Sequence, residues 1–395
     1  MHNHDQKNTY EAGKVIAALN ENPTLEYDID AALDGIDYEK VELIFRSNKE
    51  EKSNTGDLLL IYLNDKEKSA VFDAIETLLS NPYILYAEPD YIEELHLMPN
   101  DPLYRQLWGT RKIEASSAWN YTVGSNEVAV GVIDTGVDYR HPDIRENMWV
   151  SPDGRLANGW NFADNNRNPM DLDGHGTHVA GTIGAVGNNH IGVTGICWDV
   201  KVVALKFGLD IASAIAAINF ANQYDIPILN SSWGGRVYSP ALKHAVEQYH
   251  GLFIASAGNN GENNDEYPVY PASFDCDNLI SVAATNPDDE LTRFSNYGVE
   301  TVDLAAPGID ILSLSLDDEY SGQNGTSMSA PHVAGAAALL KSYIPDISVS
   351  ALKYIILASV VKRRSLAGKI TTEGVLNVND MFQLATEMID NGNIL

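Results

Sequence analysis

Short apolar runs alternate with longer amphipathic segments over about three quarters of the chain, from residue 100 onward. The short runs are bounded by glycine, asparagine or aspartate, as is typical of buried strands, and the longer segments repeat small and apolar residues at helical spacing. Strands are predicted at residues 127–133, 200–206, 225–230, 251–256 and 278–283, and helices at 175–187, 211–223, 239–249 and 328–342, with further helix after 346. This alternation predicts an α/β fold with a doubly wound, mainly parallel sheet, which we assign to a domain over residues 98–395.

The first 97 residues follow a different pattern. Strands are predicted at 14–19, 41–46, 58–63 and 83–90, with a weak helix at 28–34 and an amphipathic helix at 66–80. One face of the latter helix carries Val71, Ile75, Leu78 and Leu79. The order βαββαβ predicts a small ferredoxin-like α+β domain over residues 1–97. Modules of this kind have many uses, so the fold by itself does not indicate a function.

The chain of 395 residues is strongly acidic. Its 55 acidic and 26 basic residues give a formal net charge of −29, and residues 1–97 contribute −13 of this, from 21 acidic and 8 basic residues. The excess of negative charge argues against nucleic acid or an anionic membrane surface as a partner, and it favours bound cations. No run of 18 apolar residues is present, so no membrane-spanning helix is expected.

The two cysteines and the N-terminus limit the cellular setting only loosely. Cys197 and Cys276 lie in stretches typical of core edges and lack metal-ligand spacing, so we interpret them as buried free thiols, although a disulfide also fits the sequence. The first residues lack a basic region followed by an apolar core. Either a signal peptide has been removed or the protein stays inside the cell.

Three polar residues lie at the ends of predicted buried elements. Asp134 ends the strand at 127–133, His175 opens a helix between two glycines, and Ser327 opens the helix at 328–342. Ligands bind at the carboxyl ends of parallel strands, and a helix N-terminus is electrostatically positive. Together these residues supply the chemistry of acyl transfer: Ser327 attacks, His175 takes and returns the proton, and Asp134 holds the ring. Taken singly, Asp134 also fits a turn residue and Ser327 a helix N-cap.

The segments that contain these residues resemble the signature motifs of the subtilisin-like serine proteases. They are Asp134-Thr-Gly, His175-Gly-Thr-His and Gly325-Thr-Ser-Met-Ser-Ala-Pro, in the order found in that family. The resemblance covers roughly residues 100–385 and implies a secreted, monomeric serine endopeptidase acting on proteins or peptides. It also implies that Asn259 and the backbone N–H of Ser327 form the oxyanion hole, although Asn259 alone also fits a simple turn. His178, in the second motif, is expected to be structural.

The resemblance further implies two kinds of binding site. The substrate would contact Ser232, Trp233, Gly234, Gly235, Ala257, Gly258 and Val269. Because Val269 is β-branched and no acid lines the pocket, a medium apolar side chain such as Leu or Met is the expected specificity. A structural Ca²⁺ is expected at Asp101, Asp143, Gly187, Asn189, Ile191 and Val193. A second loop at 161–171 resembles another calcium site, but it has asparagine at 161 and 166 where relatives carry acids, which predicts weak or absent binding.

Two further features bear on how the enzyme handles peptides. The segment between Lys206 and Ile218 is about five residues shorter than the family pattern, so the edge that pairs with substrate is either truncated or rebuilt. Residues 1–97 resemble the family's inhibitory propeptide, an intramolecular partner whose closing strand often reads Tyr-Ala-Glu-Pro, as in residues 86–89. Self-cleavage is predicted at Leu97–Met98, or one residue earlier, because Pro99 makes the following bond a poor substrate.

Two other functions share some of these features. An acyl hydrolase that acts on esters would use the same three residues, but the chain lacks the Gly-x-Ser-x-Gly elbow of that class. A catalytically silent relative that binds peptides would be expected to have lost one of the catalytic residues, and Asp134, His175, Asn259 and Ser327 are all present. An autoprocessed serine endopeptidase is therefore the function that the sequence favours.

Overall fold

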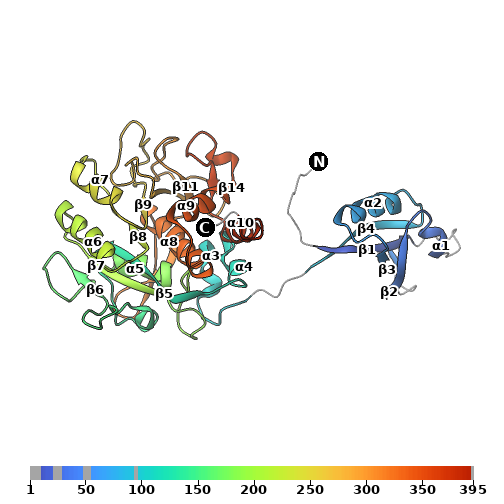
Figure 1. Cartoon of the computed structure of the whole chain (residues 1–395), viewed down its shortest axis with the longest axis horizontal. Coiled ribbons are helices and arrows are strands. Elements are labelled where there is room, and N and C mark those ends of the chain that lie inside the picture. Colours follow the sequence, from blue (N-terminus) through green and yellow to red (C-terminus); the bar gives the residue numbers. More distant parts are fainter. Residues whose placement is uncertain (1–9, 21–28, 48–54, 93–96, 393–395) are drawn as a thin grey trace. The chain divides into compact units, whose positions relative to one another are not determined.

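The computed structural model describes residues 10–20, 29–47, 55–92 and 97–392 (Figure 1). The chain divides into two compact units, Met1–Leu95 and His96–Leu395, and this division falls two residues before the boundary expected from the sequence. Both cysteines are free and buried, as expected. Within the described ranges, no helix combines the length and the apolar character needed to cross a bilayer.

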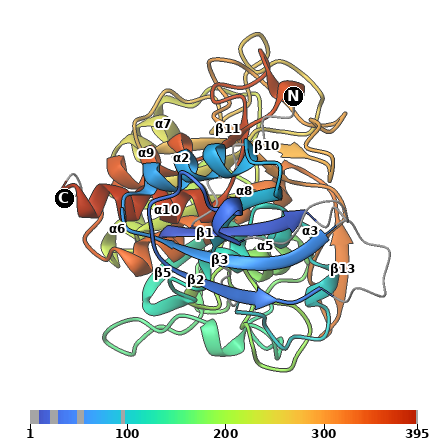
Figure 2. The same ribbon diagram turned by 90° about the vertical axis from the view of Figure 1, so that its right-hand side faces the viewer.

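The N-terminal unit is a four-stranded antiparallel sheet with helices on one face. Its elements follow the predicted βαββαβ order: β1 (Tyr10–Asn20), α1 (Ile29–Ala32), β2 (Tyr38–Phe45), β3 (Thr55–Leu63), α2 (Lys68–Leu79) and β4 (Ile84–Tyr91). The strand order is β2-β3-β1-β4, with every neighbouring pair antiparallel, and Figure 2 shows β1, β3 and β2 side by side. The ferredoxin-like α+β fold predicted for this part of the chain is therefore confirmed.

Helix α2 covers the sheet through one apolar face. Val71, Ala74, Ile75 and Leu78 are buried against alternate residues of β1 and β3. Leu79 was expected on this face, but it is 53% exposed. At helical spacing Ala74 and Leu79 lie on opposite flanks of the face centred on Val71, Ile75 and Leu78, and the sheet covers the flank of Ala74. The prediction for Leu79 is therefore wrong.

The second unit is built on a nine-stranded sheet of order β14-β15-β11-β10-β9-β8-β5-β7-β6. All neighbouring pairs are parallel except β14 and β15, so the predicted doubly wound, mainly parallel sheet is confirmed. The strands are β5 (Gly124–Asp134), β6 (Gly159–Asn161), β7 (Asp199–Lys206), β8 (Ile228–Ser231), β9 (Leu252–Ser256), β10 (Leu279–Thr285), β11 (Leu304–Pro307), β14 (Val361–Lys362) and β15 (Gly374–Val375). A separate hairpin joins β12 (Ile311–Leu314) and β13 (Tyr320–Gln323).

Helices cover both faces of this sheet. They are α3 (Trp108–Lys112), α4 (Ala115–Ala118), α5 (His175–Gly184), α6 (Ile211–Gln223), α7 (Pro240–Glu247), α8 (Thr326–Tyr343), α9 (Val349–Ala358) and α10 (Val378–Asp390). Alternate residues of β5 face opposite ways: Val130 and Val132 pack with α5, α8 and α10, whereas Ile133 packs with α6 and α7. Figure 1 shows α6 and α7 on one side of the strands and α8, α9 and α10 on the other.

The parallel register brings several strand ends to one edge of the sheet. Asp134 lies opposite Lys206 of β7, and Ile133 lies opposite Ser231 of β8, which in turn pairs with Ala255 of β9. Because carboxyl ends of parallel strands share an edge, the residues that follow these strands converge there. The N-termini of α5 and α8, which pack against one another, supply the remaining polar groups at this edge.

Candidate active site

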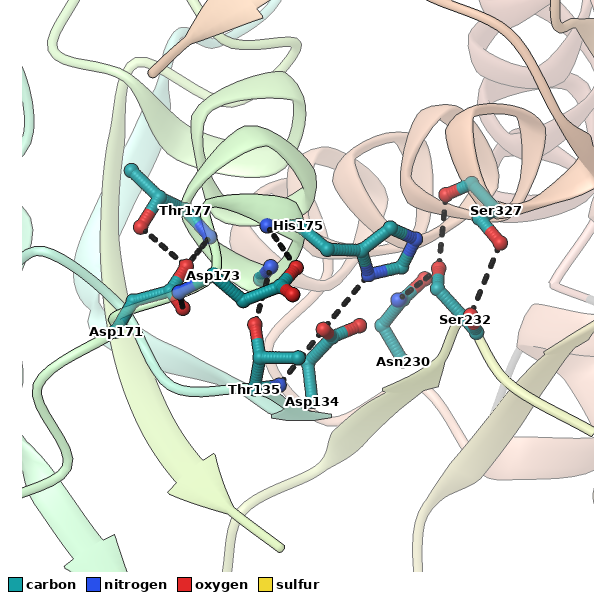
Figure 3. A network of polar contacts seen from close by, with 10 residues as sticks. Asp134, Thr135, Asp171, Asp173, His175, Thr177, Asn230, Ser232 and Ser327 are labelled. Carbon is teal, nitrogen blue, oxygen red and sulfur yellow. Dashed lines mark hydrogen bonds and ion pairs between the residues drawn. The ribbon is translucent and has the colours of Figure 1, made fainter. Parts of the chain in front are cut away.

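Asp134 and His175 form a direct hydrogen bond at this edge (Figure 3). The Nδ1 atom of His175 lies 2.7 Å from Oδ1 of Asp134, a carboxylate that is only 2% exposed. The backbone N–H of Thr135 donates to the same oxygen at 2.7 Å. Burial of the ring lowers the pKa of His175, but the hydrogen bond and charge of Asp134, with the charges of Asp173 and Asp171, outweigh burial, so its pKa is raised above the ordinary value.

The start of α5 is built so that the imidazole can lie against Asp134. The N–H of His175 is bound by Asp173 Oδ1 at 3.3 Å, and the N–H of Thr177 is bound by Asp171 Oδ2 at 2.9 Å. These carboxylates satisfy amides that a helix N-terminus leaves free. A side chain at Gly176 would overlap the carbonyl oxygen of Gly136, so only glycine allows the helix to lie this near the end of β5. Gly176 therefore serves close approach, whereas Gly174 supplies the positive φ of +102° at the N-cap of α5.

Ser327 lies in the first turn of α8 and is half-buried. Its hydroxyl donates to the carbonyl oxygen of Ser232 at 3.0 Å, and the Ser232 hydroxyl donates back to the carbonyl of Ser327 at 2.8 Å. Asn230 Nδ2 donates to the Ser232 hydroxyl at 2.9 Å. Figure 3 shows the imidazole of His175 between Asp134 and Ser327, with its second nitrogen toward the serine. The three predicted residues are thus brought together, with the hydroxyl of Ser327 turned toward Ser232.

Asn259 is held so that its amide nitrogen points outward. Its Oδ1 accepts hydrogen bonds from the N–H of Thr326 at 2.8 Å and from the Thr326 hydroxyl at 3.0 Å. A Cβ atom added to Gly325 would lie 3.3 Å from Asn259 Nδ2 and 3.6 Å from the backbone nitrogen of Ser327. The two N–H donors therefore border one small space, which stays open because residue 325 has no side chain.

Val269 lies between the two glycine-containing segments expected to contact substrate. A Cβ at Gly234 would lie 2.8 Å from one methyl of Val269, and a Cβ at Gly258 would lie 3.5 Å from the other. Gly235 is tied to Tyr270 by two backbone hydrogen bonds of 2.8 and 2.7 Å. Ala257 lies behind this region: its side chain is fully buried, and its carbonyl accepts from Asn264 at 2.8 Å. Ala257 therefore supports the pocket wall rather than lining it.

The residues expected to bind calcium lie around two buried carboxylates. Asp143 accepts hydrogen bonds from Asn189 Nδ2 at 2.8 Å and from the N–H of Val193 at 2.9 Å. Asp101 accepts from the N–H of Asn188 at 2.7 Å, while its buried Oδ1 has no partner among the described residues. Burial raises the pKa of both carboxyls, and the charge of Asp101 raises that of Asp143 further. Such an arrangement has the chemistry of a site for a hard cation.

The backbone of the loop has a repeat of two residues. Asn188, His190 and Gly192 have φ of +59°, +65° and +38°. These left-handed residues alternate with the predicted ligand positions, which are Gly187, Asn189, Ile191 and Val193. Among the described residues no three carboxylate, histidine or cysteine side chains gather as a metal cluster, so a cation here would depend on backbone and amide oxygens as well.

The loop at 161–171 is closed by its own hydrogen bonds. Asn161 Nδ2 donates to Asp164 Oδ2 at 3.0 Å and to the carbonyl of Asn168 at 3.1 Å, and Asn166 Oδ1 accepts from the N–H of Asn168 at 2.8 Å. The amide of Asn161 thus bridges two oxygens that would otherwise be available to a cation. Weak or absent calcium binding at this loop stays a prediction.

Several residues of the site escape sequence reasoning. The role of Ser232 in holding Ser327, of Thr326 in holding Asn259, and of Tyr320 at Asp143 all depend on partners 67 to 177 residues away. No local periodicity signals such contacts. The sequence placed Ser232 and Thr326 at the site only through the family motifs that contain them, and nothing in the sequence marked Tyr320.

Comparison with known proteins identifies the family. The model of the subtilase family matches residues 125–382. The chain is 39% identical over 277 residues to the thermophilic serine proteinase of Bacillus sp. (strain AK1), covering 68% of this chain and 66% of that protein. It is 36% identical over 253 residues to thermitase of Thermoactinomyces vulgaris, covering 62% of this chain and 85% of thermitase. A solved protease structure from Pseudoalteromonas arctica PAMC 21717 matches with a TM-score of 0.64 and 26% identity, covering 73% of this chain and 100% of that one. The chain therefore belongs to the subtilase family of serine endopeptidases.

Proposed function

We propose that this chain is the zymogen of a serine endopeptidase in which Ser327 is the nucleophile, His175 the general base and Asp134 its orienting acid. The observation that carries the proposal is the 2.7 Å bond between His175 Nδ1 and Asp134 Oδ1, which leaves Nε2 as the basic nitrogen on the side of Ser327. Nε2 takes the hydroxyl proton as Oγ bonds to the peptide carbonyl carbon. The C–N bond then breaks, the amine leaves with that proton, and water repeats the sequence on the acyl-enzyme.

The hydroxyl of Ser327 has to turn about one side-chain bond before it can donate to His175. The bond it gives up, to the carbonyl of Ser232, is a neutral one with a net contribution of about 1 kcal/mol. Hydrogen bonds between catalytic groups often form fully only when substrate is present. The turned hydroxyl is therefore compatible with catalysis, and Ser232 holds the backbone of Ser327 in either rotamer.

The oxyanion of the tetrahedral intermediate would occupy the space bordered by Asn259 Nδ2 and the Ser327 N–H. Both donors are held before substrate arrives, one by Thr326 and the other by α8. Preorganised donors need no rearrangement when charge develops. Removing one costs about 10²–10³-fold in kcat, a figure established on subtilisin itself.

The pocket walled by Ser232–Gly235 and Gly258, with Val269 at its floor, would take the side chain before the cleaved bond. Val269 is 5% exposed and its two methyls face the glycines of opposite walls. None of the residues that we assign to this pocket, Ser232–Gly235, Gly258 and Val269, is acidic, which fits a medium apolar side chain such as Leu or Met. Trp233 stacks on Phe207 with ring centroids 4.8 Å apart, so it supports the wall from outside.

A structural Ca²⁺ fits the loop 187–193. The carboxylates of Asp101 and Asp143, the amide of Asn189 and the carbonyls of Gly187, Ile191 and Val193 would hold it. The partnerless oxygen of Asp101 and the mutual repulsion of two buried carboxylates support this assignment. The ion would neutralise these charges and join the loop to residues 101 and 143.

The N-terminal unit would act as an intramolecular inhibitor that the enzyme removes itself. Its sheet leaves Ile16, Leu58, Leu60 and Tyr86 on the face opposite the helices, an apolar surface suited to docking. Leu97 and Met98, where cleavage is proposed, are 41% and 59% exposed, and Pro99 after them is buried. Proteases cut exposed segments outside helices and strands most readily, so this position suits self-cleavage once the N–H of Leu97 gives up its 3.1 Å bond to Asn120 Oδ1. We further propose a secreted, monomeric enzyme whose partners are proteins, peptides and this N-terminal unit.

Incubation of the purified chain tests the proposal. Wild type should resolve into two fragments, with the larger beginning within residues 95–101, whereas Ser327→Ala should stay intact. A fluorophosphonate probe should label the processed wild type and not Ser327→Ala. An unlabelled wild type that still bound peptides would instead indicate the catalytically silent relative.

A further inference from the structure

The hairpin of β12 and β13 leads directly into the nucleophile. Strand β13 ends at Gln323, and α8 begins at Thr326, one residue before Ser327. The intervening turn is fixed at both of its residues: Asn324 Oδ1 accepts from the N–H of Asp310 at 2.6 Å, and the N–H of Gly325 donates to Gly308 at 2.9 Å. A shift of β13 along its axis would therefore be passed to the first turn of α8.

Tyr320, the first residue of β13, attaches this hairpin to the loop 187–193. Its hydroxyl donates to Asp143 Oδ2 at 3.2 Å. Its ring packs so closely on Gly192 that any side chain there would overlap it, and it meets the ring of His141 edge-on at 5.3 Å. One side chain thus contacts both the loop and its central carboxylate.

A second attachment joins the hairpin to the helix of the general base. His178, three residues after His175 on α5, donates from Nε2 to the carbonyls of Ile311 at 2.8 Å and Ser321 at 3.1 Å. Burial lowers the pKa of His178 to about 4, so the ring is neutral at working pH and keeps this pattern. The hairpin is therefore held between the base helix and the loop. Among the described residues, Tyr320 is the hairpin side chain that bonds the carboxylate of Asp143, while His141, which accepts from the N–H of Asp143, also donates from Nε2 to the carbonyl of Glu319 at 3.2 Å.

We propose that Tyr320 is a positioning residue that couples occupancy of the loop 187–193 by a divalent cation to the alignment of Ser327. A cation on Asp143 fixes the carboxylate that the Tyr320 hydroxyl binds, and this fixes β13 and the backbone entering Ser327. Coupling between two sites is reciprocal, so a ligand on Ser327 must tighten the cation by the factor by which the cation tightens that ligand. This inference rests on the proposed function.

Two variants separate coupling from a general effect on folding. Tyr320→Phe keeps the ring contacts with Gly192 and His141 and removes only the hydroxyl. Tyr139→Phe is the matched control, because its hydroxyl donates to Asn168 Oδ1 at 2.9 Å in the loop 161–171 and does not touch the hairpin. The active-site ligand is a peptide aldehyde ending in leucinal, which adds reversibly to Ser327.

Two measurements are made on each processed protein. The calcium affinity is taken from the unfolding temperature against free calcium, with and without the aldehyde, and the aldehyde affinity is taken in calcium and in chelator. In wild type and in Tyr139→Phe, the aldehyde should raise the calcium affinity about fivefold or more, and calcium should raise the aldehyde affinity by the same coupling factor. Tyr320→Phe should bind calcium about tenfold more weakly, because a metal ligand that loses its hydrogen-bond partner binds the metal less tightly. Its coupling factor between calcium and the aldehyde should fall to within twofold of one.

The outcomes are distinct. If the coupling factor between calcium and the aldehyde is one in wild type, the coupling is refuted without any variant. If the coupling factor of Tyr320→Phe equals that of wild type, the role of the Tyr320 hydroxyl is refuted. Failure of every form to bind the aldehyde in excess calcium overturns the proposed function, and the coupling with it. Weak calcium binding by Tyr320→Phe with an unchanged factor would reduce Tyr320 to a support of the loop and also refute the proposal.

Discussion

Replacing Thr326 by valine should loosen the oxyanion donor without touching the catalytic residues. The Thr326 hydroxyl donates to Asn259 Oδ1 at 3.0 Å and accepts from the N–H of Gly258 at 3.1 Å. Valine removes the hydroxyl and keeps the backbone N–H, which still donates to Asn259 Oδ1 at 2.8 Å. The side-chain oxygen of Asn259 then keeps one of the two hydrogen bonds that it accepts from Thr326.

The magnitude follows from the two bonds. The bond to Asn259 is neutral and contributes about 1 kcal/mol, so kcat should fall about fivefold. KM should stay unchanged, because the oxyanion exists only in the transition state and the intermediate. Separately, the buried N–H of Gly258 loses its acceptor, which should lower the free energy of unfolding by about 1–3 kcal/mol.

A double-mutant cycle on a peptide amide with Leu before the cleaved bond tests the argument. Asn259→Ala alone should lower kcat by about 10²–10³. In the Asn259→Ala background, Thr326→Val should have no further effect, because no amide remains to be oriented. Thr386→Val is the control, since that hydroxyl donates to the carbonyl of Phe382 in α10, away from the site, at 2.9 Å. A fivefold loss from Thr326→Val in both backgrounds would refute the reasoning.

Three further results are expected. Burial lowers the pKa of His175, but Asp134, Asp173 and Asp171 together raise it by more, so kcat/KM should fall with decreasing pH through a midpoint above the ordinary histidine pKa, and a midpoint below it would contradict the geometry. Asp101→Asn should raise the unfolding temperature in chelator, where it removes a buried charge facing Asp143, and should lower it in excess calcium; a fall in both conditions would speak against a cation site. Val269→Ala should lengthen the pocket and raise the kcat/KM ratio of Phe to Leu substrates about tenfold, whereas an unchanged ratio would place the pocket floor elsewhere.

The sequence predicted most of the fold because its strands are short apolar runs and its helices are amphipathic. The helix expected at 211–223 is observed as Ile211–Gln223, and the strand expected at 200–206 as Asp199–Lys206. The short strands β11, β12 and β13 were not predicted. Strand β13 is the sequence Tyr-Ser-Gly-Gln, which has no apolar alternation and becomes a strand only by pairing with β12. Tertiary pairing decides such segments, and local propensity does not.

The catalytic residues of the candidate site were predictable from the sequence, whereas the residues that hold them in place were not. Asp134, His175, Asn259 and Ser327 stand at the ends of well-patterned elements, and the shared edge of a parallel sheet explains why they meet. The residues that hold them in place, such as Ser232 at Ser327 and Tyr320 at Asp143, are 95 and 177 residues from their partners. Their positions follow from the packing of α8 and the β12–β13 hairpin, which sequence periodicity does not encode.

The connection after β7 bears on two alternatives that the sequence leaves open. A truncated edge and a rebuilt edge were both compatible with the short segment after Lys206. Within the described part of this unit, β7 ends at Lys206 and α6 begins at Ile211, with no strand between them. Asp210 caps α6 by accepting from the N–H of Ser213 at 3.0 Å, and Phe207 turns inward onto Trp233, whereas Gly208 and Leu209 between them are exposed. We therefore expect an extended peptide to pair mainly with the backbone of Ser232–Gly235, and we propose that the pocket at Val269 is the main determinant of which peptides the enzyme cuts.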